Sequence, residues 1–172
     1  LTAGQSVTVT VRFAPTISGP LACTVETGNE DCDDVSCTGT GYPPPACSVD
    51  PIALNFGDVE VGASADDTFT ITNNGGGVLS GTVSETCDHY ELVSGGGAYS
   101  LTAGQSVTVT VRFAPTVAGT HLCEIETGAA CENVDCTGTG YDPPACSVDP
   151  SDLNFGDVEV GSSADDTFTI TN

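Results

Sequence analysis

Apolar and polar residues alternate along most of this chain, and glycine or proline interrupts the alternation at short intervals. A period of two places successive side chains on opposite faces of a β-strand. In segment 68–72, Phe69 and Ile71 share one face and three threonines share the other. Segment 106–113 places four apolar side chains on one face. No stretch shows sustained helical periodicity, so the chain is predicted to be all-β.

The alternating segments predict a seven-stranded immunoglobulin-like β-sandwich, which typically has about seven short strands in about 100 residues. The predicted strands are 47–61 with an interruption at Pro51, 68–72, 79–87, 90–93, 106–113, 121–127 and 133–139. A slip of one residue would invert every side chain, so the alternation also predicts which residues face the core. These are Phe56, Phe69, Ile71, Val83, Val109, Val111, Phe113, Ile125 and Val134.

The sequence repeats itself with a period of about 99 residues, which is a usual domain length. Residues 1–16 recur letter for letter at 101–116, and residues 46–73 recur with few changes at 145–172. The chain is therefore expected to begin and end in mid-domain. The predicted divisions are the last part of a repeat at 1–41, a proline-rich linker at 42–45, a complete repeat at 46–140, a second linker at 141–144 and the first part of a further repeat at 145–172.

Four short motifs carry a family resemblance: LNFGDVEVG, FTITN, VRFAPT and CTGTG. Together they resemble the bacterial choice-of-anchor D repeats, which are relatives of the abnormal-spindle/hydin (ASH) immunoglobulin-like domains. The resemblance covers essentially the whole chain. It implies a seven-stranded sandwich in large exported or surface-attached bacterial proteins, with no catalytic residues to carry over.

The charge balance excludes several classes of partner. Twenty-four acidic residues stand against Arg12 and Arg112, with no lysine, and the formal net charge is −22. Such a surface repels nucleic-acid phosphates and anionic lipid headgroups, whereas cations are its natural partners. No apolar run is long enough to insert into a membrane. Without lysine no lysine–asparagine isopeptide crosslink can form, so covalent reinforcement must use cysteine.

The chain contains nine cysteines and no CxxC motif, which favours disulfides in an oxidising, extracellular or cell-surface location over a metal site. The complete repeat holds an odd number of them. In an immunoglobulin topology, Cys47 would lie near Cys131 at one end and Cys87 near Cys123 at the other, leaving Cys136 as a buried thiol. A competing register pairs Ile125 with Val134 and places Cys123 directly opposite Cys136. The first scheme is preferred because a directly cross-strand disulfide strains the pleat.

Acidic pairs are the candidate metal ligands. Asp66 with Asp67, and Asp165 with Asp166, would offer oxygens to calcium if they lay in turns, although no EF-hand pattern accompanies them. The alternative is a solvated acidic surface. Arg112, on the polar face of its strand, is expected to pair with a carboxylate on a neighbouring strand.

These features favour a structural repeat module of an extracellular bacterial fibre, filament, stalk or adhesin, stabilised by disulfides and without bound cofactor. A calcium-dependent or carbohydrate-binding surface module is the alternative, and an enzyme is not expected, since His89 and His121 lack a nearby catalytic arrangement. Exposed inner faces of the two partial repeats must be covered. Adjacent repeats of a longer array would do so, or copies of the chain would complete a sandwich head to tail, with Cys146 bridging to Cys32 of the next copy.

Overall fold

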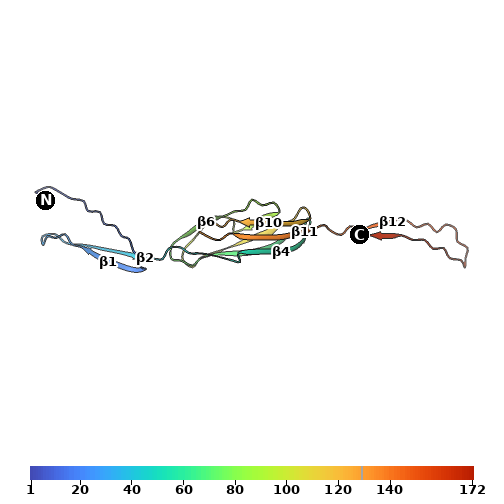
Figure 1. The fold of residues 1–172 in the computed structure, drawn as a ribbon, viewed down its shortest axis with the longest axis horizontal. Coiled ribbons are helices and arrows are strands. Elements are labelled where there is room, and N and C mark those ends of the chain that lie inside the picture. Colours follow the sequence, from blue (N-terminus) through green and yellow to red (C-terminus); the bar gives the residue numbers. More distant parts are fainter. Residues whose placement is uncertain (129) are drawn as a thin grey trace.

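The computed structural model describes residues 1–128 and 130–172, and it confirms the predicted all-β class. Figure 1 shows an elongated chain in which the complete repeat lies between two flanking segments. The strands are β1 (Gly19–Val25), β2 (Val35–Gly41), β3 (Cys47–Asp50), β4 (Ala53–Glu60), β5 (Ala65–Asn73), β6 (Leu79–Val83), β7 (Tyr90–Ser94), β8 (Gly97–Leu101), β9 (Ser106–Phe113), β10 (Gly119–Ile125), β11 (Val134–Tyr141), β12 (Ser147–Asp149) and β13 (Thr169–Thr171).

The complete repeat is an immunoglobulin-like sandwich of two main sheets. One sheet has the strand order β3-β5-β9-β7 and the other has the order β10-β11-β4. These two sheets hold seven strands, of which β3 and β4 divide the predicted segment 47–61 between the two sheets. A further pair, β6 with β8, differs from the prediction, because the glycines at the start of β8 indicate a break when the sequence is considered alone. The predicted strand 79–87 is correspondingly shorter, since β6 ends at Val83.

The core lies between the two main sheets and contains the side chains predicted from alternation. Strands β5 and β9 pair antiparallel, with Phe69 opposite Val109 and Ile71 opposite Val107. Every predicted core residue is buried except Phe56, which is half-buried. The Phe56 ring nevertheless packs against Tyr90 and Phe113, with ring centroids 5.8 Å apart in both pairs.

The first and last parts of the repeat meet in a parallel pair, β4 with β11. Both strands run along the length of the unit (Figure 1). The pairing shifts by one residue between Thr137 and Thr139, where β11 continues past the irregularity. The strand that leads out of the unit is therefore bonded directly to the strand near the entry.

The glycine at 138 makes room for the largest core side chain. A Cβ atom at this position would lie 2.5 Å from Cε1 of Phe113, closer than real carbon contacts. Phe113 itself is fully buried and its ring also contacts Tyr90. The CTGTG and VRFAPT motifs therefore depend on each other, because the small residue of one accommodates the ring of the other.

We expect Gly138→Ala to destabilise the complete unit by about 1–3 kcal/mol, because the buried ring cannot move aside without disturbing the core. Gly39→Ala is the matched control. Gly39 faces Phe13 in the same way, and a Cβ atom there would lie 2.8 Å from Cζ of the ring, but Phe13 is 53% exposed and free to turn. Chemical denaturation of both variants measures the difference, and equal effects at the two glycines would contradict it.

The flanking segments keep only part of the expected sandwich. Hairpin β1–β2 keeps the register of β10–β11, whereas residues 1–18 form no strand. Val9 is 69% exposed although its counterpart Val109 is fully buried. In 145–172 the two strands β12 and β13 pair over three positions. In the complete unit, further strands cover these apolar faces. The flanking segments have no such strands beside them, so nearly identical sequence leaves its apolar side chains exposed.

Candidate functional site

Two disulfides fasten the complete unit, and they have the pairing preferred from the sequence. Cys47 begins β3 and is bonded to Cys131, in the loop between β10 and β11, with Cα atoms 5.3 Å apart and a sequence separation of 84. Cys87 is bonded to Cys123 of β10, with Cα atoms 5.7 Å apart and a separation of 36. The first bridge lies at the entry end of the unit. The second bridge joins the segment between β6 and β7 to strand β10.

The competing register also exists in the structure, although it carries no disulfide. Ile125 lies opposite Val134, and Cys123 lies opposite Cys136, as that alternative required. Cys136 nevertheless remains a thiol that is 1% exposed. Its burial, assisted by the charges of Asp135 and Asp67, raises the pKa of the Cys136 thiol to about 11. The first alternative therefore gave the disulfide of Cys123, and the second gave the register of the hairpin that contains it.

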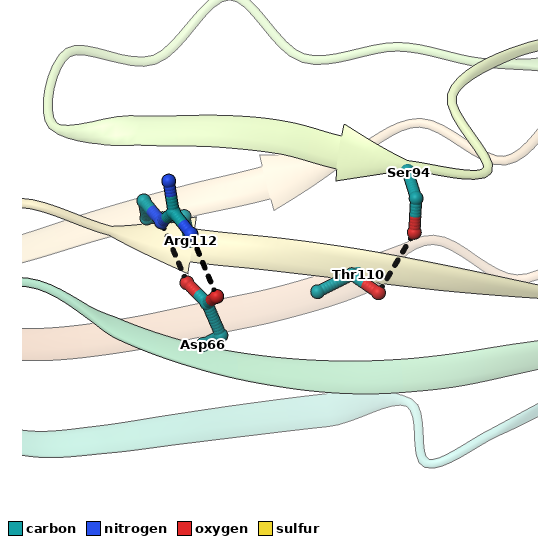
Figure 2. Close-up of polar contacts among 4 residues, drawn as sticks. All are labelled: Asp66, Ser94, Thr110 and Arg112. Carbon is teal, nitrogen blue, oxygen red and sulfur yellow. Dashed lines mark hydrogen bonds and ion pairs between the residues drawn. The ribbon is translucent and has the colours of Figure 1, made fainter.

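Arg112 makes the cross-strand ion pair predicted for it. Its Nε and Nη2 atoms donate to the two carboxylate oxygens of Asp66 on β5 at 2.8 and 2.9 Å. Figure 2 shows this bidentate pair on the polar face of the sheet, beside the hydrogen bond that the Ser94 hydroxyl donates to Thr110 at 2.8 Å. The hydrogen bonds from Arg112 lower the pKa of Asp66. The pair is exposed to solvent, so it is expected to contribute little to stability.

The pH dependence of this pair has a definite sign. The folded pKa of Asp66 lies below its ordinary value of 3.8, so the pair stabilises the fold above that value, and this stabilisation is lost as the pH falls through the folded pKa. We expect Arg112→Gln to raise the pKa of Asp66 towards its ordinary value in an NMR titration. Arg12→Gln is the control and should leave Asp66 unchanged. An unaltered Asp66 titration in Arg112→Gln would contradict the assignment.

The structure corrects the expectation that the acidic pairs lie in turns. Asp66 and Asp67 are in strand β5, where successive side chains point to opposite faces. Both carboxylate oxygens of Asp66 already accept hydrogen bonds from Arg112. Asp165 and Asp166 are exposed residues of the last segment, where Asp166 accepts a hydrogen bond from the amide of Thr167. The structure therefore does not gather either pair around one cation position.

Two histidines that the sequence presents as separate surface residues lie side by side. The rings of His89 and His121 have centroids 4.1 Å apart, and both side chains are half-buried. His89 Nδ1 accepts a hydrogen bond from the amide of Thr116 at 3.3 Å, and His121 Nε2 contacts the carbonyl of Val117 at 3.1 Å. The earlier repeat has Leu21 in place of His121. This difference between the repeats does not predict that the two histidine rings lie close together.

One group of potential metal ligands lies beside a disulfide. Oxygen or sulfur atoms of Glu85, Cys87 and Cys123 come within 4.8 Å of one another. The two sulfur atoms are bonded to each other, so neither is a thiolate ligand. The Glu85 carboxylate instead accepts a hydrogen bond from the backbone amide of Cys87 at 2.7 Å. This group is therefore best described as part of the bridge.

The first proline-rich linker is held against the complete unit. Three glycines, 75–77, lie under residues 43–45, and a Cβ atom at Gly75 would overlap the carbonyl of Pro44. The amide of Gly76 donates to that carbonyl at 3.2 Å, and the amide of Asn74 donates to the carbonyl of Ala46 at 2.7 Å. The linker is therefore docked as well as intrinsically stiff, which restricts bending between neighbouring repeats.

Comparisons with known proteins find several solved structures that are similar to part of this chain. No protein-family model matches the sequence, and a search of curated proteins finds no match. Similar solved structures include the ASH/PapD-like domain 7 of human CEP192 (TM-score 0.48, 10% identity, 57% of this chain and 87% of that one). The S-layer protein rSbsC(31-844) is another (TM-score 0.40, 20% identity, 77% and 18%). A third is WR4, a C. elegans MSP family member (TM-score 0.39, 13% identity, 55% and 97%).

All three TM-scores are below 0.5, and all three sequence identities are 20% or lower. No helix in the described parts of the chain is long and apolar enough to cross a membrane.

Proposed function

We propose that this chain is a structural, load-bearing repeat segment of an extracellular or cell-surface bacterial fibre, filament, stalk or adhesin, of the choice-of-anchor D type. The observation that carries the proposal is the position of the Cys47–Cys131 disulfide. Cys47 lies just after the entry linker at 42–45, and Cys131 lies in the loop just before β11, which runs to the exit linker. A force applied to the two linkers therefore passes through one disulfide and one extended strand, and it bypasses the rest of the unit.

Other features support the same role. The entry linker is docked on glycines 75–77, which favours a stiff rod over flexible beads. A formal charge of −22 keeps long assemblies soluble and attracts counter-cations. The disulfides suit an oxidising location. The near absence of basic residues leaves trypsin-like proteases only Arg12 and Arg112 to cut.

Limited trypsin digestion of the oxidised chain tests this role. We expect cleavage after Arg12, which lies outside any strand, and none after Arg112, which is in β9 between two paired strands. After reduction and warming, both sites should be cut. Small-angle scattering on the same sample should give an elongated particle. Rapid cleavage after Arg112 in the oxidised chain, or a compact particle, would contradict a resistant rod segment.

We propose further that the two flanking segments cover each other's apolar faces between copies of the chain. In the complete unit, β5 pairs with β9 over eight positions and β4 pairs with β11 over six. Residues 145–172 repeat the first member of each pair, and residues 1–41 repeat the second. Both pairings would therefore be available between two copies, although the counterparts of β6 to β8 would be absent. The contact joins different surfaces and so propagates head to tail.

Cys146 and Cys32 report on this contact, because they correspond to Cys47 and Cys131 and both are exposed in the single chain. Concentrated protein in air-oxidised buffer should form a ladder on non-reducing gels, with a peptide that joins Cys146 to Cys32. Cys146→Ser should abolish that ladder, whereas Cys136→Ala should preserve it. A strictly monomeric chain at high concentration would mean that the faces are covered only within a longer array.

A further inference from the structure

Three cysteines of the complete unit come together around one strand pair. Cys123 is bonded to Cys87, and the residue directly opposite Cys123 on the neighbouring strand is Cys136. Both side chains of this opposed pair are buried on the inner face of the hairpin. A groove of about 500 Å³ is lined by all three cysteines. Cys123 therefore has two cysteine neighbours, and in the folded unit it is bonded to Cys87 but not to Cys136.

Chain connectivity favours the partner that is not bonded in the folded unit. Cys123 and Cys136 are 13 positions apart and belong to one hairpin, whereas Cys87 and Cys123 are separated by 36. In an unfolded chain the shorter loop closes about fivefold more often, because loop closure scales with the three-halves power of length. A β-hairpin also forms before sheets that are distant in sequence pack together. The local pair therefore meets first.

We propose that Cys136 is a resolving thiol, which holds Cys123 in a transient hairpin disulfide until Cys87 replaces it as the sandwich closes. In the first step a small-molecule disulfide such as oxidised glutathione takes two electrons from the thiols of Cys123 and Cys136, and is itself reduced to two thiols. In the second step the thiolate of Cys87 attacks Sγ of Cys123 and breaks the bond to Cys136. Cys136 leaves as a thiolate and takes up a proton in place of the one that Cys87 lost, so this step consumes no oxidant.

Burial of Cys136 gives the exchange its direction. The reverse attack requires the Cys136 thiolate, because the thiolate and not the thiol is the nucleophile. In the folded unit this side chain is 1% exposed, and burial raises the pKa of its thiol to about 11. Closure of the sandwich therefore removes the leaving thiol from further exchange. This accounts for an odd cysteine in the core of a unit whose other cysteines are bridged.

The earlier repeat preserves the arrangement. Cys23 lies opposite Cys37 in hairpin β1–β2, as Cys123 lies opposite Cys136, although the loop between the strands is one residue longer. The opposition of the two cysteines is therefore maintained across a length change in the loop. A thiol that served only to fill the core would not need to face another cysteine.

Refolding of the reduced full-length chain in a glutathione mixture tests the proposal. Samples are quenched by alkylation with N-ethylmaleimide and digested at acidic pH with a protease that cuts after glutamate. The peptides are then analysed by mass spectrometry without reduction. We expect the Cys123–Cys136 peptide to appear first and to decline as the Cys87–Cys123 peptide rises. In Cys136→Ala, the Cys87–Cys123 bridge should form about fivefold more slowly. The matched variant Cys37→Ala, in the earlier repeat, should leave that rate unchanged.

Three results would overturn the proposal: a wild-type rate of Cys87–Cys123 formation in Cys136→Ala, no detectable Cys123–Cys136 peptide at any time, or a Cys123–Cys136 peptide that accumulates without converting. The variant Cys87→Ala gives an independent reading that does not need Cys136→Ala to fold. It should retain the Cys123–Cys136 bridge after folding. If Cys123 and Cys136 in Cys87→Ala both remain thiols in the same mixture, the hairpin does not permit the bridge and the proposal is wrong.

Discussion

Pulling the oxidised chain from its two ends is expected to lengthen the complete unit hardly at all, whereas reduction should release about 290 Å of additional chain. The estimate follows from the separation of 84 between Cys47 and Cys131 and a maximum span of about 3.5 Å per residue. With the bridge intact, the covalent path leads from the entry linker through the disulfide into β11, which is already an extended strand. Unfolding of the remaining sheets therefore adds no length between the two linkers.

The second disulfide provides an intermediate extension with which the other two lengths can be compared. In the variant Cys47→Ala/Cys131→Ala, the Cys87–Cys123 bridge still closes a separation of 36. The unit should then lengthen by about 170 Å, intermediate between the oxidised and reduced wild type. Optical-tweezer or atomic-force traces distinguish the three lengths. A release of the full length from oxidised wild-type protein would show that the bridge does not carry the load.

The sequence predicted the sandwich well because every strong signal was local. Alternation in 68–72 and 106–113 determines which side chains are buried once any sheet forms, and Phe69, Ile71, Val109 and Val111 are buried as expected. Phe56 is only half-buried because it lies at the edge of the core. Strand β8 was missed because its first residue is a glycine, which is a poor strand former and gives no signal of the pairing with β6.

The candidate site was harder to predict because it depends on residues that are distant in the chain. The bidentate pair of Arg112 followed from its place on a polar face, since the net charge guaranteed carboxylates nearby. The contact between His89 and His121 carried no sequence signal. The Asp66 and Asp67 prediction was wrong about the turn, because strand β5 begins earlier than alternation indicated: strand pairing with β9 outweighs the low β-propensity of aspartate.

Removal of both disulfides is expected to unfold the complete unit at about 37 °C, which is a common outcome when small secreted domains lose such bridges. Chain-entropy estimates assign about 4 kcal/mol to each bridge, so the two together approach the whole stability of an ordinary domain, about 5–15 kcal/mol. The core has no tryptophan or methionine to compensate. Each double variant, Cys47→Ala/Cys131→Ala or Cys87→Ala/Cys123→Ala, should therefore lose about 4 kcal/mol in urea denaturation.

Cys136→Ala separates the effect of a bridge from that of a buried sulfur. It removes a core sulfur without opening any disulfide, so its cost should be that of a small cavity, about 1 kcal/mol. Adding reductant should lower the midpoint of Cys136→Ala by as much as that of wild type, because both keep the same two bridges. If reductant instead leaves the wild-type midpoint unchanged, the packed core alone holds the sandwich together. The disulfides would then serve only to limit extension under load.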